Sequence, residues 1–476
     1  MTNAPLPEES PPSPSLRAAT KDGMAHAVMI GAGETYLGVF GIFLRATTPQ
    51  VGLLATLPAF IGAIFQAVAV FCMPFFKTRR QPIVVSAVIN ALVWLPIALL
   101  PFVLGPGSTT VSVLIVLVTI YHVAGNFGAP LWNSLIGDLV PAHSRGRYFG
   151  GRNRLIGLAT FLAVLIAGHI LDLSRTWGDE ALGFLVVFSV AAVARLLSAW
   201  WLSHYDDPPL AVRKEEMFSF YQFIRRLPRS NFARFVLFFA TINFAVAFAG
   251  PYFALYMLRD LKLSYFEFTL VGATMTVTQF LTMQHWGRLS DRFGTKKILN
   301  ICGIAVAVSP VLWLFSAELW WILVTQIYAG FVWAGFNLAS TNFMFDAVTP
   351  PKRARCAAYQ ALVNGAFVVA GSLLGGVTAD ALTALGRFTL IGVEVTQPLL
   401  VLFFISGILR VIAAWLLLPQ FQEVRPVEQI AHRHLVFQIT NLRPLSGATF
   451  SVMSGFLPGR RRKRRALDHS TNGEGT

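Results

Sequence analysis

Apolar windows of roughly 20 residues, the length of a membrane-spanning helix, recur along this chain from Ala25 onward. Each could cross about 30 Å of hydrocarbon, because an α-helix rises about 1.5 Å per residue. Short polar or charged segments separate the windows. The pattern predicts twelve membrane-spanning helices, at residues 25–44, 53–73, 83–104, 111–133, 155–171, 182–202, 234–257, 266–286, 298–316, 319–341, 357–379 and 398–418.

The composition agrees with an all-α integral membrane protein. Of the 476 residues, 55% are hydrophobic and 13% are charged, whereas about 25% of the residues of a soluble protein are charged. Cys72, Cys302 and Cys356 have no paired Cys or Cys/His spacing, so we expect neither a metal nor a cofactor. The spans contain no carboxylate pair and no nucleophile–base set, and the chain has no nucleotide-binding loop, so we expect no enzyme.

The net charge of +15 is distributed unevenly between the two sets of alternating loops. If the N-terminus is inside, the inner loops hold twenty basic residues and the outer loops hold five, as the positive-inside rule requires. Both termini are therefore expected in the cytoplasm, and the protein in a bacterial inner membrane. The outer five are Arg45, Arg175, Arg259, Lys262 and Arg387.

The longest interruption divides the helices six and six and sets the expected domains. Residues 1–24 read as a disordered cytoplasmic tail, because they are rich in Pro and Ser and lack a basic leader region. The first bundle is expected at 25–202 and the second at 234–418. Between them, 203–233 is a cytoplasmic linker whose aromatic-basic stretch suits either an interfacial helix or a solvated linker. A basic cytoplasmic tail, 419–476, follows.

The second half of the chain repeats the first. Six polar or glycine positions recur in kind 208 positions later: Asp138, Arg145, Arg147, Gly157, Gly168 and Asp172 return as Asp346, Arg353, Arg355, Gly365, Gly376 and Asp380. Because each half contains an even number of spans, equivalent helices point the same way, and the halves are parallel repeats. A substrate site is expected between the two halves, near the midplane.

Two loop motifs give this repeat a family resemblance. The run from Gly287 to Lys297, GRLSDRFGTKK, resembles the cytoplasmic loop motif of the major facilitator superfamily, while the first-half loop keeps only its basic part. The repeated Asp-x6-Arg, at Asp138 and Asp346, resembles the charge-relay element of the same superfamily, with Asp in place of Glu. The resemblance implies the major facilitator fold, with twelve helices in two parallel six-helix repeats. It also implies transport by alternating access.

Charged residues at the inner loops are the candidate inner gate. Carboxylate–guanidinium pairs there can form when the cytoplasmic side closes and separate when it opens. The alternative is that the same charges only fix topology and cap helices. The candidate set is Asp138, Arg145, Asp291, Arg292, Asp346 and Arg353.

Glu34 is the carboxylate that the pattern places well inside a span. An ionised acid there is costly, so its presence suggests a function. Glu34 can carry protons, serve as a structural hydrogen bonder, or bind a cationic or hydroxylated solute. His122, at similar depth in the fourth span, is the second proton-coupling candidate, and interhelical hydrogen bonding is its alternative role. The resemblance implies that the first and fourth helices both line the cavity.

Amide and aromatic side chains in the spans are candidates for binding the substrate, a neutral or weakly charged organic molecule. For the amides, hydrogen bonding between helices is the competing role. The candidates are Tyr36, Asn126, Trp132, Asn243, Tyr252, Gln326, Trp333 and Asn337.

The sequence therefore predicts a monomeric, proton-coupled secondary transporter of a small organic solute. A non-transporting receptor or assembly scaffold with the same fold is the alternative, and it would not need Glu34. The basic run Arg460–Arg465 is expected to bind anionic lipid rather than nucleic acid.

Overall fold

The computed structural model describes residues 14–140, 145–208, 230–348, 353–384, 388–390, 393–395 and 397–424. The chain separates into two compact units, Met1–Val427 and Glu428–Thr476, and all described residues belong to the first. The aromatic-basic stretch of the predicted linker and the basic run Arg460–Arg465 lie outside the described residues.

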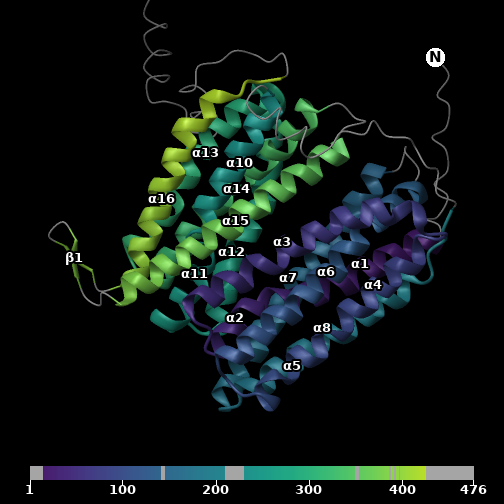
Figure 1. Ribbon diagram of the computed structural model, residues 1–476, viewed down its shortest axis with the longest axis horizontal. Helices are drawn as coiled ribbons and strands as arrows, with labels where there is room; N and C mark the ends of the chain where they lie inside the picture. The colour runs from purple at the N-terminus through teal and green to yellow at the C-terminus, as the bar shows by residue number, and fades with distance from the viewer. Residues whose placement is uncertain are drawn as a thin grey trace, which may run out of the picture. The chain divides into compact units, whose positions relative to one another are not determined.

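Helices of the first half lie together in Figure 1. They are α1 (Pro14–Ala32), the 3-10 turn η1 (Glu34–Tyr36), α2 (Leu37–Phe43), α3 (Thr48–Cys72), η2 (Met73–Phe75), α4 (Arg80–Leu92), α5 (Trp94–Val103), α6 (Ser108–Leu139), α7 (Arg145–Thr176) and α8 (Glu180–Leu202). The first and third spans are each divided, into α1 with α2 and into α4 with α5.

The second half repeats this order of helices. It consists of α10 (Asn231–Ala247), α11 (Gly250–Leu255), η4 (Tyr256–Asp260), α12 (Tyr265–Phe293), α13 (Thr295–Val311), η5 (Leu312–Leu314), α14 (Leu319–Ala347), α15 (Arg353–Ala384), α16 (Pro398–Leu417) and η7 (Leu418–Gln420). A short antiparallel hairpin, β1 (Phe388–Leu390) with β2 (Val393–Val395), precedes α16 and was not predicted.

Each of the twelve predicted spans coincides with a helix or a divided helix, so the all-helical fold class is confirmed. Eleven of these segments are both long and apolar enough to cross a membrane within the described chain. The remaining one, α12, has 29 residues but carries threonines, two glutamines and a histidine along its length. This helix packs against both α7 and α14, and its threonine hydroxyls donate to backbone carbonyls one turn earlier in the same helix.

The first helix begins at Pro14, eleven residues before the predicted start. Residues 14–24, which the sequence pattern assigned to a disordered tail, are therefore helical. Their polar side chains have partners in the folded chain: the Ser15 hydroxyl donates to Asp206 (2.5 Å), and Asp22 accepts from Ser198 (2.6 Å). A hydropathy pattern misses such a segment, because its polar groups are satisfied by distant residues.

Equivalent helix starts in the two halves are capped in the same way, which supports the repeat. In the first half, the backbone N–H of Arg80 donates to Asp207 (2.9 Å), just after α8. At the equivalent place in the second half, the N–H of Lys296 donates to Glu423 (2.8 Å), just after α16. A carboxylate thus caps the helix that follows each tight inner loop.

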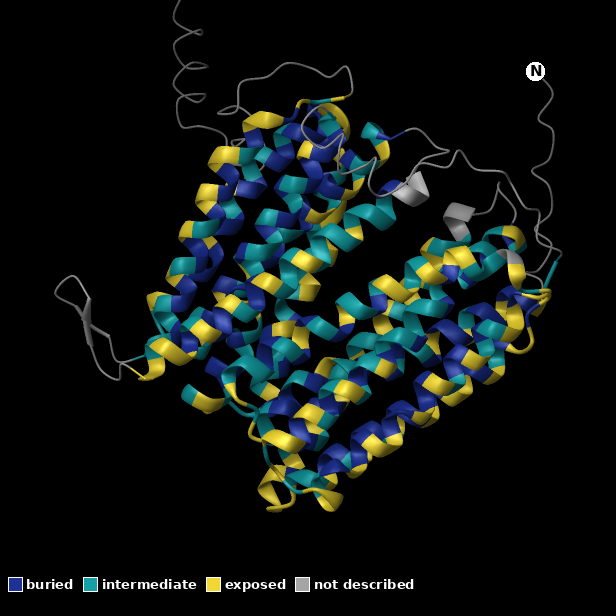
Figure 2. Ribbon diagram, in the orientation of Figure 1, coloured by how far each residue is buried: buried dark blue, intermediate teal, exposed yellow. Residues whose placement is uncertain are grey.

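Large apolar side chains are exposed on the outward sides of the helices, for example along α8 and α16 (Figure 2). Phe71, Phe280 and Trp415 are each about two-thirds exposed or more. Exposed apolar surface of this extent fits contact with lipid chains rather than with water.

Phe421 anchors the segment after α16. It is 1% exposed and packs on Phe235, Phe238 and Phe343 with ring centroids 5.1–5.7 Å apart. We expect Phe421→Ala to lower the free energy of unfolding by about 3 kcal/mol, because it leaves a cavity among packed rings. Thermal unfolding in detergent measures this. Trp415→Ala, at a 75% exposed position of α16, is the control, and equal melting temperatures for the two variants would contradict the packing argument.

Candidate functional site

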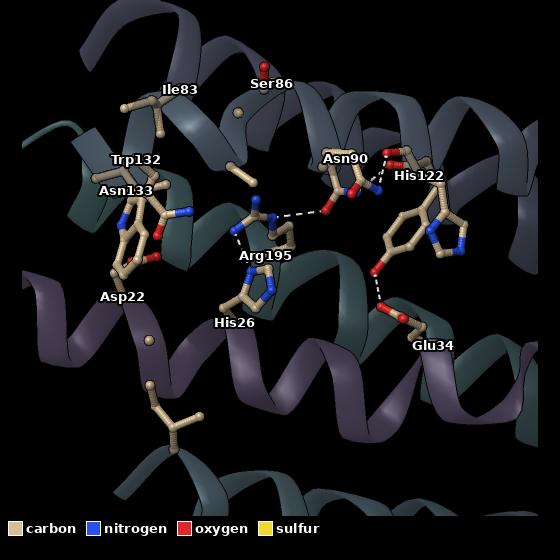
Figure 3. A pocket seen from close by; sticks show the side chains of 18 of the residues that line it. Asp22, His26, Glu34, Ile83, Ser86, Asn90, His122, Trp132, Asn133 and Arg195 are labelled. Carbon is tan, nitrogen blue, oxygen red and sulfur yellow. Dashed lines mark hydrogen bonds between the residues drawn. The ribbon is translucent and has the colours of Figure 1, made fainter. Parts of the chain in front are cut away.

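A cavity of about 530 Å³ is lined by α1, η1, α4, α6, α7 and α8 of the first half (Figure 3). Its volume is in the range of small-molecule sites. Every residue that lines it lies between Asp22 and Leu202. The sequence led us to expect a site shared by both halves, and this cavity belongs to the first half alone.

Glu34 lines the cavity where the first helix is broken. The break lies at Gly33, where a Cβ atom would come within 2.7 Å of the Trp94 ring, so only glycine allows this close packing. The Glu34 carboxylate accepts a hydrogen bond from the Tyr121 hydroxyl (2.7 Å). Within the described chain, no Lys, Arg or His nitrogen lies within 4.0 Å of it. The Glu34 charge therefore has a hydrogen-bond partner but no countercharge.

His122 lines the same cavity, on α6. Its ring packs edge-on against the neighbouring Tyr121 ring, with centroids 5.2 Å apart. Tyr121 is thus in contact with both proton-coupling candidates, His122 through its ring and Glu34 through its hydroxyl. The structure brings the two candidates to one cavity, as the sequence suggested.

A second polar cluster, centred on Arg195, lines the cavity farther along α1. The Arg195 guanidinium donates from Nε to Asn90 (2.9 Å) and from Nη1 to Ser198 (2.7 Å). It also lies 2.7 Å from Nδ1 of His26. Because a guanidinium can only donate, Nδ1 of His26 accepts, and the ring proton is assigned to Nε2.

Asp22 completes this cluster and is 4% exposed. Besides Ser198, its carboxylate accepts from the Tyr205 hydroxyl (3.0 Å) and lies 4.0 Å from the Arg152 guanidinium. Burial, and then the nearby Asp22 charge, raise the pKa of Tyr205, so this phenol remains a donor. Gly23 makes room for the pair, since a Cβ there would lie 2.6 Å from Arg152 Nη2.

No functional role was predicted from the sequence for Asp22, His26 or Arg195. Glu34 is therefore not the single acid in the first span. The available signal was the repeat: Arg195-Leu-Leu-Ser-Ala-Trp200 matches Arg410-Val-Ile-Ala-Ala-Trp415 in the second half. Arg410 is buried, and it donates to Val306 O and Ser309 (both 3.1 Å) rather than to groups around a cavity. The two halves thus differ at equivalent arginines.

The predicted substrate residues divide into three groups. Asn126 and Trp132 line the cavity, with Arg152 stacked on the Trp132 ring at 4.8 Å. Tyr36 and Tyr252 are fully buried in hydrogen bonds elsewhere. Residues of the second half lie outside this cavity: the Asn243 amide donates to Phe239 O, Gln326 and Trp333 are half-buried, and Asn337 is exposed.

The candidate inner-gate residues are only partly described. Asp138 pairs with Arg79 (2.6 Å) of its own half, and Arg79 also lies 3.6 Å from Asp207. Asp346 accepts from the Thr295 hydroxyl (3.4 Å). Asp291 and Arg292 are exposed, and Arg292 stacks on the Phe293 ring at 4.9 Å. The side chains of Arg145 and Arg353 lie outside the described residues.

Contacts between the halves cluster toward the predicted outer side. The Tyr36 hydroxyl hydrogen-bonds with Thr269 (2.6 Å), and the Tyr265 hydroxyl donates to Glu180 (2.6 Å). Gly52 lies so close to the second half that a Cβ would be 2.4 Å from the Tyr252 oxygen. The two halves are therefore packed directly against each other at this end of the helices.

Comparison with known proteins gives a consistent result. A family model described as Major Facilitator Superfamily matches residues 24–250 and 232–459. The efflux pump azaK of Aspergillus niger is 31% identical over 107 residues, 22% of this chain and 23% of that protein. The class H tetracycline resistance protein of Pasteurella multocida is 32% identical over 94 residues, 20% of this chain and 23% of that protein. The chain thus matches about a quarter of each relative's length.

Solved structures share the fold. A mutant form of the nucleoside transporter NupG superposes with a TM-score of 0.66, at 13% identity, over 86% of this chain and 100% of that one. At this identity the likeness concerns the fold alone. Together with the family match, it confirms the predicted arrangement of two parallel six-helix repeats.

We expect Gly52→Leu to open the outer side, because the added side chain cannot fit against Tyr252. Spin labels at Thr109→Cys and Ala317→Cys, on exposed outer positions of the two halves, measure the separation once the three native cysteines are replaced. Gly38→Leu is the control, since its Cβ would meet nothing within 4 Å. An unchanged label distance in Gly52→Leu would refute the packing assigned to this contact.

Proposed function

Because the chain belongs to the major facilitator superfamily, we propose that it is a secondary active transporter of a small organic solute. It works by alternating access and is coupled to protons through Glu34. Membership of this family supports transport rather than an enzymatic activity. The substrate class, the direction of transport and the coupling ion belong to the proposal.

The observation that carries the proton coupling is the environment of Glu34. Its carboxylate borders a cavity, accepts one hydrogen bond from Tyr121, and has no cation within 4.0 Å among the described residues. An acid in this setting can gain a proton when the cavity is dry and lose it when the cavity is hydrated. Such a change in charge can bias the equilibrium between two conformations of the transporter.

His122 is the second member of the proposed pathway. Imidazole exchanges protons near neutral pH, and this ring reaches the same cavity as Glu34. We propose that it passes protons between the cavity and the Glu34 carboxylate, with Tyr121 between the two side chains. In this scheme His122 affects the rate of coupling, whereas Glu34 is required for it.

Alternating access requires the outer contacts to break and an inner set to form. We propose that the inner closure uses Asp138, Asp291 and Asp346 with arginines of the inner loops, namely Arg145, Arg292 and Arg353. Asp138 is half exposed beside Arg79, so its carboxylate remains accessible to a further partner. Breaking the outer pairs Tyr36–Thr269 and Tyr265–Glu180 exposes groups that water can satisfy, which keeps the two states close in free energy.

The membrane setting extends the proposal. The distribution of basic residues supports both termini in the cytoplasm and a bacterial inner membrane. The run Arg460–Arg465 would attract anionic lipid. The transport unit is proposed to be a monomer, since both repeats lie within one chain.

Glu34→Gln tests the proton coupling. It keeps the hydrogen bond from Tyr121 but removes the titratable acid, so we expect the variant to lose solute flux driven by an imposed pH gradient. The measurement is flux in proteoliposomes, using a panel of labelled organic solutes. Glu318→Gln, an exposed carboxylate outside the cavity, is the matched control and should behave as wild type.

Gradient-driven flux that survives Glu34→Gln would remove Glu34 from the coupling mechanism. If the wild-type protein moves no solute of the panel down a concentration gradient or a pH gradient, the transport proposal fails in favour of a receptor or scaffold.

His122→Gln separates rate from coupling. We expect slower initial uptake, because proton exchange with the cavity loses its relay, but the same final accumulation ratio, because Glu34 still binds the proton. Time courses in the same proteoliposomes give both quantities. A lower final accumulation would instead make His122 part of the coupling stoichiometry.

A further inference from the structure

The cavity in the first half contains two charges of opposite sign that lack a direct countercharge. Glu34 is one, as described above. Arg195 is the other: it is 8% exposed, and no carboxylate of the described chain lies within 4.0 Å of it. Its Nη2 group makes no hydrogen bond to the residues that the structure describes, since its bonds run from Nε and Nη1. Both side chains line the same cavity.

Asp22 does not neutralise Arg195 on its own. Its charge attracts Arg195, but its hydrogen-bond connection to the guanidinium runs through the Ser198 hydroxyl, which accepts from Arg195 and donates to Asp22. The same carboxylate also faces Arg152 at 4.0 Å. One carboxylate therefore serves two guanidinium groups, and this end of the cavity carries an excess positive charge. The end at Glu34 carries the matching negative charge.

Leaving a buried charge such as Arg195 without a direct partner is costly, and a ligand that supplies an opposite charge would recover that cost. The donors at the positive end are Arg195 Nη2 and the Nε2–H of His26, which both belong to the cavity wall. A carboxylate can accept from a guanidinium and an imidazole together. At the other end, the Glu34 carboxylate can accept from an ammonium group.

The spacing excludes the smallest solutes of this kind. His26 and Glu34 are eight residues apart on the first span, which corresponds to about 12 Å along a helix. We propose that the cavity binds a zwitterionic organic solute whose carboxylate contacts Arg195 and His26 and whose amine contacts Glu34. The inference rests on the proposed transport function and names the substrate class of the same site.

The second half supplies the contrast that makes Arg195 specific. The equivalent Arg410 is also buried, but it lines no part of this cavity and donates to Ser309 and to a backbone carbonyl. A role shared by both arginines, such as supporting the helix bundle, would not depend on a zwitterion. Arg410→Gln is therefore the matched control for Arg195→Gln.

Equilibrium binding of linear amino acids to the purified full chain in nanodiscs tests the proposal. Aminohexanoate and aminooctanoate are the probes, with glycine as the short comparison. We expect the longer probes to bind at least about tenfold more tightly than glycine. Capping either end, as the N-acetyl derivative or the methyl ester, should cost about tenfold or more, because each cap removes a charged hydrogen bond. The capping comparison uses the wild-type protein and so does not depend on the folding of a variant.

Variants assign each end of the ligand. Arg195→Gln should remove the preference for the free carboxylate over the methyl ester, and Glu34→Gln the preference for the free amine over the N-acetyl derivative. Arg410→Gln should retain both, with melting temperatures recorded for all three. Equal affinity of the wild type for capped and uncapped probes, or no binding of any of them, would overturn the zwitterion site. Proton-driven flux of other solutes would persist in that case, so failure of this site is distinguishable from failure of the transport function.

Discussion

The cost of burying charge in a low-dielectric interior governs the first half of this protein. Asp22, Arg152 and Arg195 are all largely buried, and they are stable there because hydroxyl, amide and imidazole groups surround them. The close helix packing is linked to this constraint, because a Cβ atom at Gly23 would clash with the Arg152 guanidinium. Glu34 obeys the same rule less completely, with a single tyrosine hydroxyl as its partner. In the proposed mechanism, this incompleteness leaves Glu34 available for a proton or a ligand.

The two halves share a fold but differ in the surroundings of equivalent residues inside their helix bundles. Their inner ends are capped by equivalent carboxylates, Asp207 and Glu423, so the repeat is preserved where it maintains architecture. It diverges inside the bundles, where Arg195 borders a polar cavity and Arg410 does not. Under the proposed function, this asymmetry would let the first half hold the binding site while the second half provides the surface against which it moves. The hydrogen bonds of Tyr36 and Tyr265 cross between the halves and would have to break in such a movement.

Much of the fold was predictable from the sequence, because both main signals are local. The twelve apolar windows indicate the helices, and the repeated Asp-x6-Arg indicates the two halves. The start of the first helix was not predictable, because Ser15 and Asp22 resemble residues of a polar tail. Only the structure shows that Ser15 is hydrogen-bonded to Asp206 and Asp22 to Ser198. The expectation that Glu34 and His122 share one cavity came from the family resemblance, which implies that the first and fourth helices line it, together with their similar depth in the spans. The role of Tyr36 could not be found this way, because its hydroxyl is bound by Thr269, a residue far away in sequence.

The proposed proton coupling requires that Glu34 binds a proton inside the first half. Infrared difference spectra of the purified protein, recorded while the pH is changed, detect the C=O stretch of a protonated carboxyl group directly. We expect a protonated-carboxyl band that titrates in the wild type and is missing in Glu34→Gln. Identical titrating carboxyl bands in the two proteins would contradict the account.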